Sequence, residues 1–508
     1  MDERLRAVCD LDLVRVREGA GRHEYDGRVP DLSPDGVRRG LARLGAGAAP
    51  ADPHDAAHLA AAERRLHAEL GDPGDGGAAL HRRSPRRLLA ALDLAVYDRP
   101  YAPAAERADA RRRHLAAWPD AVDAGLAALD LLTAPVAGAL VGSVRGAAAT
   151  VDPDEPGGAA ALAAHDRLVA HLERAADTGD PDPALGGAVL ARLLADGGPE
   201  PVDLDAMAAA ADAERDRLLA LLGQGCSRLR PGAPAHQVVE GLVTDHPDAD
   251  GVLTTARALT AEVVAFTREH DLLDPADLDG ECRVEPSPPS RRWATAMLAW
   301  AAPGEPDGPS YYSITPPDPS WPEPQQRQWL SAFSHTTLPT TTAHEVAPGH
   351  FAHGRALRRV RGDVRRTLHS DATVEGWAHY AEELMVEEGF RADDPRFAVG
   401  VAVKALLRVT RLAVAIGVHT GTTTVAEAER RFADDAFLRG PAARAEAARA
   451  TFDPTYGRYT WGKLALRDLR ERARREWGAA FTLRRFHRAV LDLGAPPLPL
   501  LGAALDGG

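Results

Sequence analysis

The sequence predicts a mainly α-helical protein with a small β insertion, and three features of the residue pattern support this. Apolar residues recur at spacings of three and four over long segments up to about residue 235 and again after about residue 325. Pro- and Gly-rich joints such as GDPGDGG and DPDEPGG separate the helical segments. Residues 281–323 differ, because they are rich in proline and aromatic residues and contain short runs typical of strands.

Residues 1–235 carry clear helical patterns. The segments DAAHLAAAERRLHAEL and DAERDRLLALLGQGC each place apolar residues on one side of a helix. No unit of fixed length repeats, so a solenoid is not indicated. We therefore expect a helical half at residues 1–235 and a second half at residues 236–508. The second half would contain the β insertion and further helices between residues 340 and 390.

Two runs inside the insertion have the composition of strands. They are ATAMLAW, residues 294–300, and SYYSI, residues 310–314. We expect them to form a small antiparallel sheet. The predicted fold class is thus mainly α with a small antiparallel β-sheet.

The charge balance excludes one class of partner. The chain has 60 basic and 74 acidic residues, which gives a net charge of −14. Nucleic-acid binding usually needs basic patches that neutralise phosphate, so this acidic chain is not expected to bind nucleic acid. The sequence leaves the choice between a monomer and a homodimer open.

Cysteine usage and the N-terminus indicate the compartment. Cys9, Cys226 and Cys282 are far apart and form no CxxC pair, which is typical of a reducing environment. The N-terminal segment MDERLRAVCDLDL is charged from its second residue and lacks the pattern of a signal peptide. No apolar run reaches the roughly 20 residues of a membrane span. We therefore expect a cytoplasmic protein with no membrane contact.

The segment TTAHEVAPGHFAHGRAL, residues 341–357, contains a stretched zinc-binding pattern. In His-Glu-x-x-His the histidines share one face of a helix. His344 and His350 are six residues apart, which puts them about 120° apart on a regular helix. Pro348 removes a backbone donor and Gly349 tolerates unusual angles, so a bulge there would bring the two histidines together. A chance grouping among 19 histidines is the alternative.

A second segment, DATVEGWAHYAEEL, begins a predicted helix at residue 371 and contains acidic and histidine side chains that could bind a metal. Glu375 and His379 are four residues apart and share a helix face, and Glu382 lies about one further turn along. The Gly, Trp and Tyr residues beside these charges favour the wall of a cleft. An ordinary solvated helix face is the alternative.

These segments resemble the bacterial domain-of-unknown-function family 885, a branch of the gluzincin-type zinc metallopeptidases. The family signature HExxPGH stands here as HEVAPGH, residues 344–350, and EGWxxY stands as EGWAHY, residues 375–380. Three further segments are similar to the family, so the resemblance spans most of the chain: RPYAP near residue 100, YTWGKLALRDLRERA and RRFHRAVLDLGAPPLPLL. Phe351 is a departure, because the family often has a second histidine there.

The resemblance implies a gluzincin-like clefted fold, in which residues 1–235 form one wall of the groove, and a zinc-dependent metallopeptidase acting on short peptides. Gluzincins take a third ligand from a glutamate on a later helix, and Glu375 lies 31 residues after His344, at about such a distance. The implied Zn²⁺ ligands are His344, His350 and Glu375. Glu345, beside the first ligand, is the expected general base, which would take a proton from water and pass it to the leaving amine.

A further donor is expected to stabilise the oxyanion of the reaction. Related gluzincins use a tyrosine, and the match in YTWGK makes Tyr459 the first candidate. Tyr456 and His379 are the alternatives and are expected to contact the substrate. The competing interpretation of Tyr459 is a packing aromatic residue with its hydroxyl at the surface.

The predicted substrate is a short peptide, whose backbone an exposed edge strand would hold. Residues 309–314 are the candidate edge strand, and a plain hairpin strand is the alternative. A zinc amidase or isopeptidase on a small non-peptide amide would use the same metal residues. A helical interaction protein with a lapsed metal site is the third hypothesis, against which the intact His, Glu, His and Glu set argues.

Overall fold

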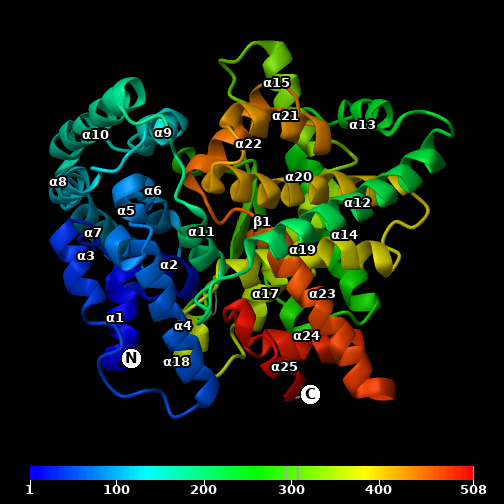
Figure 1. The fold of residues 1–508 in the computed structure, drawn as a ribbon, viewed down its shortest axis with the longest axis horizontal. Helices are drawn as coiled ribbons and strands as arrows, with labels where there is room; N and C mark the ends of the chain where they lie inside the picture. The colour runs from blue at the N-terminus through cyan, green and yellow to red at the C-terminus, as the bar shows by residue number, and fades with distance from the viewer. Residues whose placement is uncertain (293, 306–307, 507–508) are drawn as a thin grey trace.

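The protein is mainly helical with one small sheet (Figure 1). The computed structural model describes residues 1–292, 294–305 and 308–506. The predicted fold class is confirmed at this level. Three residues of the predicted insertion at residues 281–323 lie outside the described residues.

The first helices of the chain gather on one side of the molecule, blue to cyan in Figure 1. An apolar core around the buried Trp118 joins several of them. Capping residues define their ends: Asp52 accepts backbone N–H bonds at the start of α4, and Pro53 takes the first helical position. The helices on this side are α1 (Glu3–Leu11), α2 (Leu13–Ala20), α3 (Pro34–Leu41), α4 (Pro53–Leu70), α5 (Leu80–Arg83), α6 (Arg86–Leu92), α7 (Ala104–Ala116), α8 (Trp118–Ala128), α9 (Ala134–Ala147) and α10 (Gly158–Thr178). α11 (Gly187–Leu194) and α12 (Leu204–Leu229) follow them, and α12 lies among the later helices.

The later helices pack around α20, a long and largely apolar helix. α20 contacts α12, α16, α19, α22 and α23, so it connects the two halves of the chain with the helices that carry the predicted site. These helices are α13 (Ala235–Val243), α14 (Ala249–Glu269), α15 (Glu323–Leu330), α16 (Leu338–Glu345), α17 (His350–Ala356), α18 (Asp363–Thr367), α19 (Asp371–Glu387), α20 (Pro395–Thr420), α21 (Val425–Asp435), α22 (Pro441–Phe452), α23 (Arg458–Trp477), α24 (Leu483–Leu491) and α25 (Ala503–Asp506).

The sheet is mixed, so the predicted antiparallel sheet is only partly right. It contains β1 (Cys282–Pro286), β2 (Ala296–Ala299) and β3 (Ser310–Ile314), in the order β1-β3-β2. β2 pairs antiparallel with β3, as expected, but β1 pairs parallel with β3. β1 was not predicted, because CRVEP is short and two of its five residues are charged.

The position of β3 corrects a second expectation. Residues 309–314 were expected to supply an exposed edge strand, but β3 lies between the other two strands and pairs on both sides. Most of its side chains are buried, which fits a central strand. β2 is instead an edge strand of this sheet, and it contacts α16.

The two halves of the chain share a packed interior. Side chains of α12 and α20 form one apolar core across the boundary expected at residue 235. Buried ion pairs also cross it, because Lys463 on α23 contacts Glu214 on α12 at 2.5 Å. A substrate groove with residues 1–235 as one wall stays a prediction, as does the gluzincin-like cleft. None of the helices in the described part of the chain has the length and apolar character that a membrane crossing requires.

Candidate metal centre

The chain between α16 and α17 breaks at the predicted Pro-Gly pair. Residues 346–349 leave the helical path, and a new helix starts directly after them. A Cβ atom on Gly349 would lie 1.9 Å from the carbonyl oxygen of His344, so only glycine fits where the chain passes this close. The indole Nε1 of Trp377 donates to the carbonyl oxygen of Pro348 at 2.9 Å and ties the break to α19.

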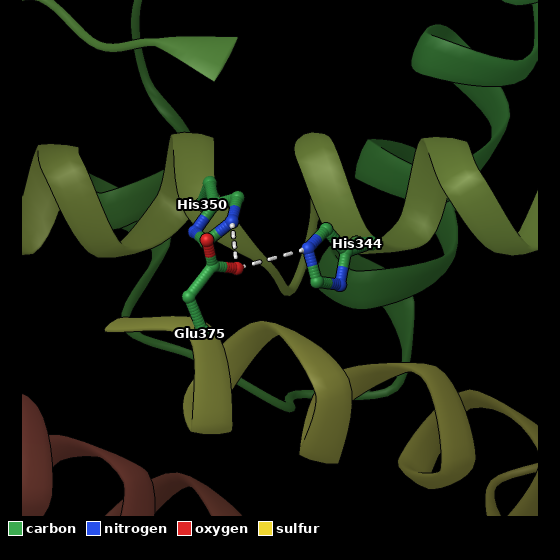
Figure 2. Close-up of side chains that lie close together, drawn as sticks. All are labelled: His344, His350 and Glu375. Atoms are coloured by element: carbon green, nitrogen blue, oxygen red, sulfur yellow. Dashed lines mark ion pairs between the residues drawn. The ribbon is translucent and has the colours of Figure 1, made fainter. Parts of the chain in front are cut away.

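The break brings the two histidines together, and Glu375 on α19 completes a group of three (Figure 2). Oε2 of Glu375 lies 3.4 Å from Nε2 of His344 and 3.3 Å from Nε2 of His350. One ligand atom from each residue lies within 4.8 Å of the others. Tetrahedral zinc holds ligand atoms at about 2.0–2.2 Å, which puts neighbouring ligands about 3.3–3.6 Å apart. Two imidazoles and a carboxylate at this spacing therefore fit a zinc ion with one position open.

Charged groups behind His344 fix its orientation. Its Nδ1 lies 2.6 Å from Oε1 of Glu382, and Arg408 donates to the other oxygen of that carboxylate at 2.8 Å. Burial and Arg408 act to lower the pKa of His344, but hydrogen bonds to Glu375 and Glu382 outweigh them and raise it to about 9. A carboxylate on Nδ1 leaves Nε2 facing Glu375, where a metal ion would replace the proton.

Glu345 lies at the end of α16, next to the first histidine. Its side chain is buried, and its Oε2 has no hydrogen-bond partner among the described residues. Burial raises the pKa of the Glu345 carboxyl group, although the nearby His344 and His350 oppose the effect. A buried carboxyl group with a free oxygen and a raised pKa, beside candidate ligands, has the properties of a general base.

Tyr459 reaches the group from α23. Its hydroxyl donates to Oε1 of Glu375 at 3.0 Å, and its side chain is half-buried. Two glycines allow this contact, because α19 and α23 cross where Gly376 meets Gly462. A Cβ atom on Gly376 would lie 2.5 Å from Cα of Gly462. Gly462 lies inside the continuous helix α23, where the missing side chain permits this close helix crossing.

The two remaining predicted site residues lie deeper in the protein. His379 is 1% exposed, and its Nδ1 lies 3.3 Å from Glu382, so it connects to His344 through that carboxylate. Tyr456 is fully buried in an apolar core, and its hydroxyl has no hydrogen-bond partner in the described part of the chain. The structure therefore does not bring either side chain to the three ligands. Direct contact with a substrate would require both to leave the interior.

Sequence reasoning gave no role to Glu382 or Arg408. Glu382 was noted one turn beyond His379, and its position seven residues after Glu375 puts it on the same helix face, but the pattern does not indicate that it contacts His344. Arg408 carries no such signal. It lies on α20, outside every motif, and only the packing of α20 against α16 and α19 brings it to Glu382.

Comparison with known families gives a match over nearly the whole chain. The family described as "Bacterial protein of unknown function (DUF885)" matches residues 16–505. The chain belongs to this family. All the candidate site residues of this DUF885 protein lie inside the matched region. The family description states no activity, so membership assigns no reaction, and the gluzincin relationship stays a prediction. No curated protein matches the chain.

Two solved structures have the same fold as this DUF885 protein. A "putative lipoprotein of unknown function" from Shewanella oneidensis is 19% identical, with a TM-score of 0.73, and the match covers 98% of this chain and 97% of that one. A "putative lipoprotein" from Colwellia psychrerythraea is 16% identical, with a TM-score of 0.77 and coverage of 99% and 97%. At these identities the likeness shows the fold alone. The cytoplasmic location of this chain stays a prediction.

Proposed function

We propose that this DUF885 protein is a gluzincin-type zinc metallopeptidase that hydrolyses amide bonds of short peptides. The observation that carries the proposal is the group His344, His350 and Glu375, whose ligand atoms lie within 4.8 Å of one another. Two histidines and one glutamate form the ligand set of several zinc peptidases. The carboxylate of Glu382 on the first histidine supports the same assignment, because metal-binding histidines usually carry such a partner.

Zinc, when bound, polarises a carbonyl group and makes water more acidic. Glu345 would take the proton from the attacking water as the water oxygen bonds to the carbonyl carbon. It would then give that proton to the leaving nitrogen as the C–N bond breaks. The buried position of Glu345 suits both steps, because its raised pKa lets the carboxyl group hold the proton between them.

Tyr459 would act on the oxygen of the same carbonyl group. Negative charge grows on this oxygen in the transition state, and a positioned phenol donates to it more strongly than to the ground-state carbonyl. The hydroxyl already lies at the candidate centre, on Oε1 of Glu375. It would exchange that acceptor for the developing oxyanion.

β2 takes the role that the sequence analysis gave to residues 309–314. It lies at an edge of the described sheet and contacts α16, the helix that carries His344 and Glu345. An extended peptide added to this edge would run beside the candidate centre. The hydrogen bonds of strand addition would hold the backbone of the substrate.

The test is hydrolysis by the purified full-length chain, supplied with zinc and incubated with a mixed library of short peptides. We expect cleavage that a chelator abolishes and that added zinc restores. Glu345→Gln should bind zinc as the wild type does and lose turnover by about 10²–10⁴-fold, because only the proton acceptor is removed. Loss of the metal in this variant would contradict the division of roles between Glu345 and Glu375.

A zinc amidase or isopeptidase would use the same residues, so the library should also contain small non-peptide amides. Cleavage of these alone would replace the peptide substrate and leave the metal chemistry in place. No hydrolysis of any compound by a zinc-loaded chain would favour the helical interaction protein with a lapsed site.

A further inference from the structure

We propose that Lys404 binds a carboxylate group of the substrate beside the candidate zinc site. This inference rests on the proposed peptidase function and adds the substrate class, which is peptides with a carboxylate near the scissile bond. Lys404 lies on α20 and shares a helix face with Arg408 and Arg411, four and seven residues further along. α20 contacts α16 and α19, which carry the candidate ligands, and α23, which carries Tyr459.

Positive charge surrounds the ring of Tyr459. The guanidinium carbons of Arg408 and Arg458 each lie 5.6 Å from the ring centre, and that of Arg411 lies 5.4 Å away. The hydroxyl of the same ring donates to Glu375 at 3.0 Å. Arg408 and Arg411 on α20 therefore lie against the ring of Tyr459, and the hydroxyl of that ring contacts a candidate zinc ligand.

The arginines of this region already have carboxylate partners within the protein, and Lys404 does not. The pairs are Arg408 with Glu382 at 2.8 Å, Arg411 with Glu446 at 2.6 Å and Arg458 with Asp453 at 2.9 Å. Lys404 is half-buried and has no ion pair or hydrogen bond from its side chain among the described residues. It is one of only two lysines in the chain, and the other, Lys463, is fully buried in ion pairs.

The surroundings of Lys404 disfavour a charge without a partner. Burial lowers the pKa of its ammonium group to about 8, and the neighbouring Arg408 and Arg411 add to this effect. Glu382 and Glu446 oppose it, but each is held by an arginine. An anion from outside the chain would supply the missing partner and so bind favourably.

The proposed peptide substrate supplies a carboxylate, and the arginines beside Lys404 leave no second cation free to complete a phosphate site. Arginine commonly binds phosphate through two hydrogen bonds from its guanidinium group. The guanidinium groups of Arg408 and Arg411 already bind carboxylates of this chain. A peptide offers a carboxylate at its C-terminus or on an acidic side chain.

Binding of matched peptides to the full-length, zinc-loaded protein tests the proposal. The probes are an alanine tetrapeptide with a free C-terminus, its C-terminal amide, and amides with Asp or Asn in the last position. Calorimetry in the Glu345→Gln background measures affinity without cleavage. Lys404→Met should weaken binding of the carboxylate probes by about 10–100-fold and leave the neutral probes unchanged, because one charge-assisted contact is lost. Lys404→Arg should restore most of the binding.

The pattern across the probes identifies the source of the carboxylate. Preference for the free C-terminus over its amide indicates the terminal group, and preference for Asp over Asn indicates a side chain. Arg475→Met, an exposed basic residue near the end of α23, is the matched control and should change no affinity. Equal effects of Lys404→Met on charged and neutral probes, or no effect on either, would overturn the proposal.

The two proposals fail in different ways. If the wild type cleaves no peptide and Lys404→Met still loses carboxylate binding, the peptidase proposal is wrong and the carboxylate site stands. If the wild type cleaves charged and neutral peptides equally, and Lys404→Met behaves like the wild type, the carboxylate site is wrong and the peptidase stands. Zinc content measured for each variant separates both outcomes from loss of the metal.

Discussion

The hydroxyl of Tyr459 donates a hydrogen bond to Oε1 of Glu375 at 3.0 Å, although 84 residues separate the two in the chain. The contact depends on the close crossing of α19 and α23 at Gly376 and Gly462. It joins the residue expected to stabilise the oxyanion to the residue expected to complete the zinc site. The crossing of α19 and α23 thus positions both the proposed zinc ligand Glu375 and the proposed oxyanion donor Tyr459.

Tyr459→Phe tests this relationship. We expect kcat to fall by about 10²–10³-fold, because the variant loses a donor that acts on the developing oxyanion. Zinc content and melting temperature should change little, since the ring remains and Glu375 keeps its contacts with both histidines. Steady-state kinetics and metal analysis of the full chain make the comparison.

Tyr456→Phe is the matched control for that variant. It removes the hydroxyl of a fully buried tyrosine that has no hydrogen-bond partner among the described residues, so kcat should stay near the wild-type value. A normal kcat in Tyr459→Phe together with a reduced kcat in Tyr456→Phe would transfer the oxyanion role to Tyr456.

Glu382→Gln tests the support of the first histidine. The variant keeps the shape of the side chain but removes the negative charge between His344 and Arg408. We expect zinc affinity to fall by about 10–100-fold, the usual effect of losing a partner of a metal-binding histidine. Competition with a coloured chelator measures the affinity. Glu388→Gln, at the end of α19 and away from His344, is the control, and an equal loss in both variants would contradict the assignment.

His23 provides a pH-dependent link between the N-terminal helices and the segment after β2. Its Nε2 lies 2.9 Å from Glu305, and its Nδ1 lies 3.3 Å from Asp26. Burial acts to lower the pKa of His23, but hydrogen bonds with Asp26 and Glu305 outweigh it and raise the pKa from 6.5 to about 9. Because the folded pKa exceeds the unfolded one, this stabilisation is full below about pH 6.5 and is lost as pH rises through about 9.

His23→Gln should therefore lower the free energy of unfolding by about 2 kcal/mol near pH 6, the scale of a hydrogen bond to a charged group. Near pH 9.5 the variant and the wild type should have similar melting temperatures, because His23 is then neutral in both states. Thermal unfolding at the two pH values measures the difference. A loss of the same size at both pH values would show that packing, not charge, is responsible.

Much of the candidate site follows from local sequence. The positions of Pro348 and Gly349 predict the break that brings His344 and His350 together, because their backbone preferences act within one turn. Glu375 and His379 lie four residues apart on one helix, α19, as the sequence predicts. In the fold, the mainly helical character and the pairing of β2 with β3 are confirmed.

What the sequence could not predict depends on contacts between distant segments. The parallel pairing of β1 with β3 requires the chain to pass through β2 and return, and no local pattern records that path. Arg408 reaches Glu382 only because α20 packs against α19. The neighbours of His379 in the chain favoured a cleft wall, but tertiary packing buries its side chain.

Zinc content of the purified full chain tests the central claim most directly. After removal of loosely held metal, the wild type should retain one zinc ion per chain. His350→Ala and Glu375→Ala should each lose it, because two ligands from the chain bind zinc far more weakly than three. His335→Ala, at an exposed histidine outside the group, should keep it. A wild-type chain without zinc after loading, or His350→Ala and Glu375→Ala variants that both keep a full complement, would contradict the proposed centre.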